Sequence, residues 1–379
     1  MAKLSKNRPT SPAQKTRTVR QILVHGAWLC LLASLCVAAV PLLLGQIESV
    51  DSSPSRELWV NEARLEGHLA LRYSPAGAFS PDSSTLAVVN RDKVALIDLR
   101  SDGSLRKVVR PRVENIADFD IQSANFIDAS GLFMLATGFL HAKDKGPGGP
   151  TPLLAFSWDT VADALTGKIN AVGPGGGFGP ARYFPVIGYL GLYKESNFDI
   201  WNPVSGRGSR VNIPAVTRAP GLYEFSPDGH WLLLAQIEGS SSADPVVVQL
   251  SEHRFVDALR GHPGTVLGIS FSRDSKKVVT ACEDGKVRVW SVPDWKLLET
   301  LAGHKGPVHW AEFSADGHWV ASGGEDKTVR IWSEGDGKLA QTLEEARDPV
   351  LTLAFSPNGE YLAASTEQTV LVWQRKRGG

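Results

Sequence analysis

The sequence of 379 residues is short of cysteine, of methionine and of any excess of charge. Three cysteines are too few for the disulfide framework of a small secreted scaffold. The 40 Lys and Arg residues equal the 40 Asp and Glu residues, so the chain lacks the basic surplus that binding to nucleic acid phosphates requires. HExxH, Gly-x-Ser-x-Gly and paired metal-binding cysteines are missing as well. We therefore predict no catalytic residue, no metal and no cofactor.

An uncharged run of 18 residues, from Ala27 to Leu44, lies near the N-terminus. As a helix it would be about 27 Å long, close to the ~30 Å thickness of a bilayer core. The sequence thus predicts a transmembrane helix over residues 26–45. The alternative is a cleaved signal peptide, but its apolar core is normally about 7–15 residues long. The residues at the end of the run, Leu43-Leu44-Gly45, also make a poor cleavage site.

The charges that flank this run predict an orientation. Residues 1–25 form a basic tail without an acidic residue, and its charged side chains are Lys3, Lys6, Arg8, Lys15, Arg17 and Arg20. The positive-inside rule places this tail in the cytoplasm and sends the rest across the membrane, with residues 46–56 as a linker. The chain has no Asn-x-Ser/Thr sequon, which favours a bacterial inner membrane and its periplasmic face over an endoplasmic reticulum lumen. A cytosolic location of the C-terminal part is the alternative.

Separating the tail changes the meaning of the neutral total. The tail carries a charge of +6, so residues 26–379 carry −6. The larger part of the chain is mildly acidic, and we predict that it does not bind nucleic acid.

The C-terminal third contains a repeat. Gly261-His262 opens one unit, which closes on Trp290, and Gly303-His304 opens the next, which closes on Trp332. The two histidines are 42 residues apart, and so are the two tryptophans. A third copy ends on Trp373 but has Glu345-Ala346 in place of Gly-His. Within each unit, short alternating apolar runs are separated by Asp-Gly or Asn-Gly turns, a pattern typical of β-strands.

This repeat resembles the WD-repeat β-propeller family, in which each unit supplies a four-stranded blade. The resemblance implies a buried, structural hydrogen-bond chain of four side chains in each complete repeat. The matching positions are His262, Thr280, Asp284 and Trp290 in the first repeat, and His304, Ser322, Asp326 and Trp332 in the second. An Asp buried in a tight turn needs such partners, because an unpaired charge is costly to remove from water.

Weaker copies precede these repeats, starting at Gly67-His68, Phe126, Arg182 and Phe225. Together with the three C-terminal copies they predict an all-β, seven-bladed WD-repeat-type β-propeller over residues 57–377, preceded by a single N-terminal transmembrane helix. Residues 58–65 align with residues 294–301, so we expect the N-terminal strand to complete the last blade and close the ring.

In proteins that this sequence resembles, partners dock on the face that carries the loops before the innermost strands and the Asp turns. Carried over by alignment, the candidate docking positions are Thr265, Leu267, Glu283, Pro307, His309, Glu325, Lys327, Leu351 and Glu367. Their mixed apolar and acidic character suits a protein or peptide partner.

The main hypothesis is a membrane-tethered propeller that acts as a non-catalytic scaffold for protein interactions. Two alternatives stay open. One is an extracytoplasmic propeller enzyme such as a hydrolase or lactonase, which requires His, Asp or Glu side chains that converge at the channel mouth. The other is a structural subunit of an envelope assembly complex.

Overall fold

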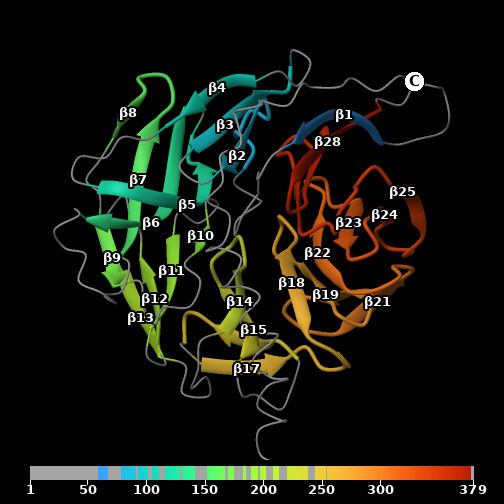
Figure 1. Cartoon of the computed structure of the whole chain (residues 1–379). Coiled ribbons are helices and arrows are strands. Elements are labelled where there is room, and N and C mark those ends of the chain that lie inside the picture. Colours follow the sequence, from blue (N-terminus) through green and yellow to red (C-terminus); the bar gives the residue numbers. More distant parts are fainter. Residues whose placement is uncertain are drawn as a thin grey trace, which may run out of the picture. The chain divides into compact units, whose positions relative to one another are not determined.

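Every regular element in the described part of the computed structural model is a β-strand (Figure 1). The structure describes residues 59–66, 78–90, 93–100, 105–110, 116–128, 130–140, 152–166, 170–174, 182–184, 189–194, 197–201, 208–212, 220–237, 244–252 and 254–376. All of these belong to one compact unit, Gly45–Gly379. The predicted basic tail, transmembrane segment and linker lie outside the described residues. Within those residues there is no helix long and apolar enough to cross a membrane.

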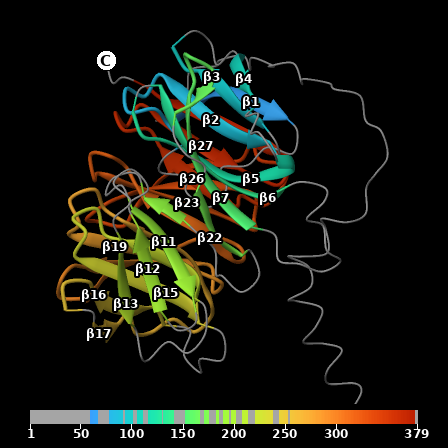
Figure 2. The same ribbon diagram turned by 90° about the vertical axis from the view of Figure 1, so that its left-hand side faces the viewer.

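The described strands form seven antiparallel sheets, numbered here I to VII along the chain. Sheet I contains β2 (Thr85–Asn90), β3 (Lys93–Asp98) and β4 (Leu105–Val109). Sheet II contains β5 (Ile116–Phe126), β6 (Gly131–Leu140), β7 (Pro152–Asp159), β8 (Ala164–Leu165) and β9 (Asn170–Pro174). Sheet III contains β10 (Arg182–Phe184), β11 (Tyr189–Lys194), β12 (Asn197–Trp201) and β13 (Gly208–Asn212), of which the last three run side by side in Figure 2.

The C-terminal half continues in the same order. Sheet IV contains β14 (Pro220–Phe225), β15 (Trp231–Ile237), β16 (Val246–Gln249) and β17 (Arg254–Ala258). Sheet V contains β18 (Val266–Phe271), β19 (Lys277–Cys282), β20 (Lys286–Ser291) and β21 (Leu297–Ala302). Sheet VI contains β22 (Val308–Phe313), β23 (Trp319–Gly324), β24 (Val329–Ser333) and β25 (Leu339–Leu343). Sheet VII contains β26 (Thr352–Phe355), β27 (Tyr361–Ser365), β28 (Thr369–Arg375) and β1 (Trp59–Glu66).

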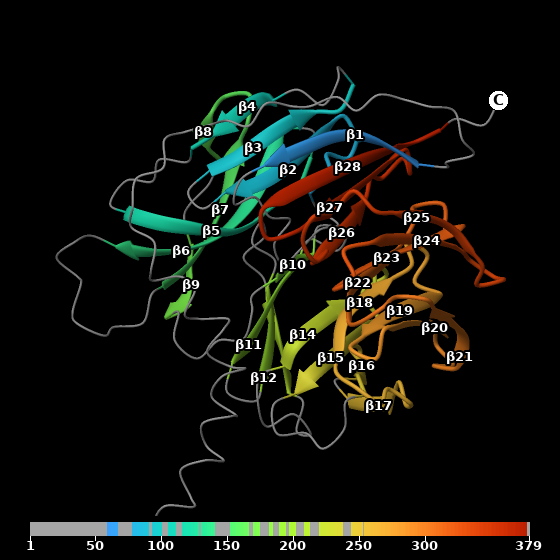
Figure 3. The same ribbon diagram turned by 45° about the vertical axis from the view of Figure 1, so that its right-hand side comes forward.

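Sheet VII joins two ends of the sequence. β1 pairs with β28 in antiparallel register, from Trp59 opposite Arg375 to Glu66 opposite Thr369 (Figure 3). Further bonds tie sheet VII to sheet I: Asn358 N donates to Ser83 Oγ at 3.1 Å, and the Tyr361 hydroxyl donates to Leu99 O at 2.8 Å. Because β1 pairs with β28, it covers an edge of β28 that would otherwise be open to other strands.

A repeated Phe-Ser-x-Asp/Asn sequence forms the turn between the first two strands of a sheet. In sheet VI, Ser314 Oγ donates to Asp316 Oδ1 at 2.6 Å and accepts from Trp319 N at 3.0 Å. Gly317 has a φ of 71°, a left-handed conformation that glycine adopts without steric strain. The same serine bonds to the Asp or Asn two residues later in the turns at Ser80, Ser226, Ser272 and Ser356. The side chains thus supply the turn's hydrogen bonds, as Ser and Asp commonly do.

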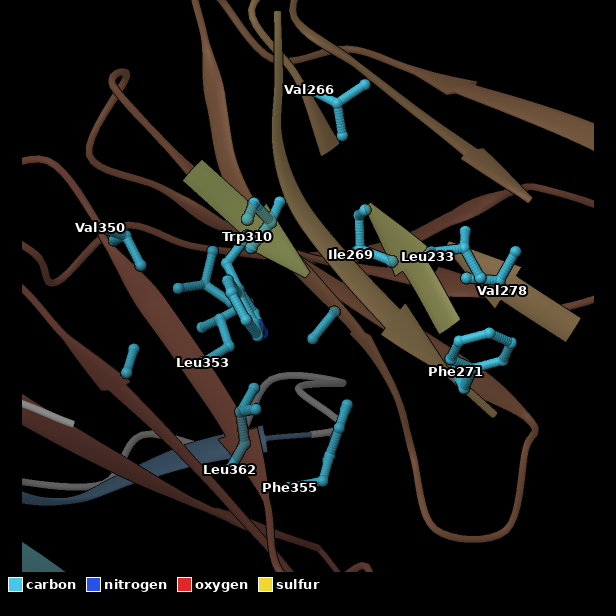
Figure 4. Packing of buried hydrophobic residues seen from close by; sticks show 14 of the residues in the cluster. Leu233, Val266, Ile269, Phe271, Val278, Trp310, Val350, Leu353, Phe355 and Leu362 are labelled. Carbon is cyan, nitrogen blue, oxygen red and sulfur yellow. The ribbon is translucent and has the colours of Figure 1, made fainter. Parts of the chain in front are cut away.

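Apolar side chains fill the spaces between consecutive sheets, so strands are buried on both faces. All five residues of β27 are buried. The largest cluster spans sheets IV to VII, where Val266 and Ile269 of sheet V, Trp310 of sheet VI and Leu353 of sheet VII contribute to one core (Figure 4). Other clusters join sheet VII to I, I to II, and III to IV. Burial of each large apolar side chain contributes about 1.5–3 kcal/mol, so this packing is the main stabilising term.

Candidate functional site

In the second repeat the four side chains form the continuous hydrogen-bond chain that the resemblance implies. Trp332 Nε1 donates to Ser322 Oγ at 2.8 Å, and Ser322 Oγ lies 2.8 Å from His304 Nε2. The other ring nitrogen, Nδ1, lies 2.9 and 3.0 Å from the two carboxylate oxygens of Asp326. These hydrogen bonds connect β23, β24, the turn between them and the loop that leads into β22.

The first repeat has the same chain up to the histidine and then departs from the expectation. Trp290 Nε1 donates to Thr280 Oγ1 at 3.1 Å, and Thr280 Oγ1 lies 2.8 Å from His262 Nε2. Asp284, however, forms an ion pair with Arg288, with distances of 3.2 and 2.7 Å. The prediction that Asp284 bonds to His262 is therefore wrong.

His262 has different partners on its Nδ1 side. Nδ1 lies 2.9 Å from Leu259 O and 3.2 Å from Asp244 Oδ1. A carbonyl oxygen can only accept, so Nδ1 carries the proton and Nε2 accepts from the Thr280 hydroxyl. The same reasoning applies to His304, because the carboxylate of Asp326 accepts from its Nδ1. In both neutral rings, Nδ1 donates a hydrogen bond and Nε2 accepts one.

Burial sets the charge of these histidines. It lowers the pKa of His262 and of His304, more than their neighbouring carboxylates raise it. For Asp326, burial raises the pKa, but the hydrogen bonds from Lys305 N and His304 outweigh it and lower the pKa to about 2. Because their pKa values are lowered, both imidazoles are neutral at pH 7, and both side chains are buried within the sheets.

The third repeat has lost the chain but kept its tryptophan. Trp373 is fully buried, and its Nε1 has no hydrogen-bond partner. Ser322 lies opposite Arg330, two residues before Trp332, and Ala364 lies opposite Leu371, two residues before Trp373. A methyl group therefore occupies the place of the acceptor hydroxyl in sheet VII. The Trp373 indole therefore contributes through its packing in the core.

The candidate docking positions of the first repeat come together at one end of sheet V. Glu283 N donates to Thr265 O at 2.9 Å, and Glu283 Oε2 accepts from Thr265 N at 3.3 Å. Thr265 and Glu283 are exposed, and Leu267 is half-buried. The turn after β19 is thus fastened to the segment that begins β18.

The second repeat repeats this arrangement on sheet VI. Glu325 N donates to Pro307 O at 2.8 Å, and Glu325 Oε2 lies 3.1 Å from His309 Nε2. Lys327 Nζ donates to Arg347 O at 2.8 Å, in the segment that leads to β26. Glu325 and Lys327 are exposed, whereas Pro307 and His309 are half-buried.

Sheets V and VI bring these positions close to one another. Gly268 on β18 lies so near β22 that a Cβ atom on it would be 2.7 Å from His309 O. In sheet VII, Leu351 precedes β26 with 36% of its surface exposed, and Glu367 is exposed between β27 and β28. The candidate positions of sheets V and VI are therefore neighbours, and those of sheet VII occupy the corresponding ends of its strands.

Three residues of this region, Asp244, Arg288 and Arg330, were not singled out from the sequence. Asp244 lies outside the repeat units that the Trp spacing defines, so its place beside His262 could be found only in three dimensions. Arg288 stands four residues after Asp284, and Arg330 stands four after Asp326. That repeated spacing is a signal in the sequence for an ion pair within the turn. In the described part of the chain, no group of three or more His, Cys, Asp or Glu side chains is placed to hold a metal ion.

The repeats that build this region match a known family. The family model "WD domain, G-beta repeat" (WD40) matches residues 253–291, 295–333 and 337–374. No curated protein matches the sequence. The three matches run from β17, the outer strand of sheet IV, through sheets V, VI and VII, and agree with the all-β architecture. They identify three WD40 repeats between residues 253 and 374, and such repeats generally mediate protein interactions.

Proposed function

We propose that this protein is a membrane-tethered WD-repeat propeller and a non-catalytic scaffold that binds a protein or peptide partner. The observation that carries the proposal is the set of three matched repeats, in the first two of which the recurring polar side chains form structural hydrogen bonds. A fold whose recurring His and Asp residues are used in this way offers its surface for function.

The seven described sheets are the basis for proposing seven blades. Clusters of apolar side chains connect sheet VII to I, I to II, and III through VII in sequence. β1 completes sheet VII from the N-terminal side. A ring of seven blades closed by β1 would leave few free strand edges, which suits a stable binding platform.

The proposed docking surface consists of Thr265, Leu267, Glu283, Pro307, His309, Glu325, Lys327, Leu351 and Glu367. Its support is the repeated geometry on sheets V and VI, where an exposed glutamate is bonded to the start of the innermost strand. Leu351 adds apolar surface and the glutamates add negative charge, a mixture that fits a protein partner.

Capture of partners by the full-length chain tests this surface. We expect the Leu267→Asp/Leu351→Asp double variant to lose partners that the unchanged chain retains, because a charge replaces apolar contact. Leu298→Asp is the matched control, since Leu298 is 49% exposed but lies on the outer strand β21. An identical set of partners on the double variant and the unchanged chain would overturn the assignment.

The membrane location rests on the uncharged run at residues 26–45 and its basic flank. We propose a cytoplasmic N-terminus and a propeller on the periplasmic face of a bacterial inner membrane. Protease added to intact spheroplasts should digest the propeller. Digestion only after membrane rupture would place the propeller in the cytosol instead.

A further inference from the structure

Asp244 lies at a junction between two sheets and binds the loop that leads into β18. It is located two residues before β16 of sheet IV. Its Oδ1 atom accepts from Gly261 N at 2.9 Å and from His262 N at 2.9 Å, and lies 3.2 Å from His262 Nδ1. One carboxylate oxygen therefore holds three donors of the neighbouring loop.

The surrounding backbone strengthens this connection. Leu259 N donates to Pro245 O at 2.9 Å, and Leu259 O accepts from His262 Nδ1. The His262 side chain is buried, and the Asp244 side chain is one-fifth exposed. Bonds to an ionised acceptor in such a place are shorter and stronger than neutral ones.

Asp284 differs from the corresponding residue of the second repeat, Asp326, in its bonding partner. In sheet VI, Asp326 accepts both from His304 and from Lys305 N, at 2.9 Å in each case. In sheet V the corresponding acceptor for the histidine and the adjoining loop amides comes from the preceding sheet, and Asp284 pairs with Arg288.

We propose that Asp244 replaces Asp284 as the carboxylate of the first repeat's hydrogen-bond chain, and is the positioning residue of the loop that carries Thr265. The consequence for partner binding rests on the proposed function, because Thr265 lies in the loop that Asp244 fixes and Leu267 follows on β18. The assignment of Asp244 itself does not depend on any partner. Through Asp244, the segment that precedes β16 then helps to hold the docking surface in place.

Hydrogen exchange of the full chain tests the assignment at the two amides concerned. Asp244→Ala should accelerate exchange at Gly261 and His262 by about tenfold or more, the ratio for a loss of ~1.4 kcal/mol in local stability. Asp244→Asn should restore protection, because all three contacts use a single oxygen that the amide also provides. Asp284→Ala/Arg288→Ala, which leaves no buried charge unpaired, should leave these two amides protected.

The comparison remains decisive if Asp244→Ala fails to fold. Asp244→Asn and Asp284→Ala/Arg288→Ala then give the answer, since the proposal requires protection of Gly261 and His262 in both. Loss of protection at these two amides in either variant, beyond that of the other amides of sheet V, would overturn it. Loss of partner capture is measured separately with Leu267→Asp, so that failure of the proposed function and failure of the Asp244 assignment are distinguished.

Discussion

Trp332 donates its indole N–H to the hydroxyl of Ser322 at 2.8 Å, and both side chains are buried. Ser322 in turn bonds to His304, so this one hydroxyl serves two partners. The bond fixes the register of β23 and β24 by side chains in addition to the backbone ladder. Its removal therefore has a larger effect than the loss of an ordinary surface hydroxyl.

Ser322→Ala should lower the free energy of unfolding by about 1–3 kcal/mol, because it leaves the Trp332 N–H and His304 Nε2 buried without partners. Urea unfolding followed by tryptophan fluorescence measures the change. Thr300→Ala on the exposed side of β21 is the control, with an expected change within about 0.5 kcal/mol. Equal effects of the two substitutions would contradict the role of Ser322.

Ala364→Ser should stabilise the protein by about 1 kcal/mol, because it places a hydroxyl where Trp373 Nε1 lacks an acceptor. Ala363→Ser is the matched control: it is equally buried and adjacent on β27, but its side chain points to the opposite face. We expect the control to destabilise. A gain for Ala363→Ser, or none for Ala364→Ser, would show that the indole does not use a hydroxyl at this place.

Some of this site follows from the sequence, and some does not. The 42-residue spacing of His262 and His304, and of Trp290 and Trp332, predicts a repeat of β-strands, and the resemblance of that repeat to the WD-repeat family implies the bonds through Thr280 and Ser322. These bonds depend on strand register, which a repeat encodes locally.

The partner of Asp284 could not be predicted in the same way. Both repeats have an Asp followed by an Arg four residues later, yet the ion-pair distance is 2.7 Å for Asp284–Arg288 and 3.7 Å for Asp326–Arg330. What differs is Asp244, which reaches His262 from another sheet. A contact between sheets depends on packing and loop length, and the repeat pattern contains neither.

Stability should fall as the pH drops from 7 to 5. The pKa values of His262 and His304 are lowered by burial, so the unfolded chain binds protons on these residues near pH 6.5 while the folded chain does not. Urea unfolding at a series of pH values measures the slope. His304→Gln should reduce this slope, whereas His318→Gln, at an exposed position, should leave it unchanged.

A second loss of stability is expected at lower pH. The pKa of Asp326 is lowered to about 2 in the folded protein, so its contribution is complete above about pH 4 and disappears as the pH falls toward 2. In the Asp326→Asn variant, the free energy of unfolding should depend less on pH in that range. An unchanged pH profile in this variant would mean that Asp326 is not held ionised by Lys305 N and His304.

The ion pair of Asp284 and Arg288 should be costly to break from one side. The two side chains are 14% and 7% exposed and are joined by two hydrogen bonds. Asp284→Ala leaves the buried guanidinium without its carboxylate, and loss of one partner of a buried pair typically destabilises by about 3–5 kcal/mol. Asp284→Ala/Arg288→Ala should cost less than Asp284→Ala alone, because no charge is then stranded. If the double variant is at least as unstable as the sum of the two single variants, the pair is not coupled, and Asp284 acts through the turn backbone alone.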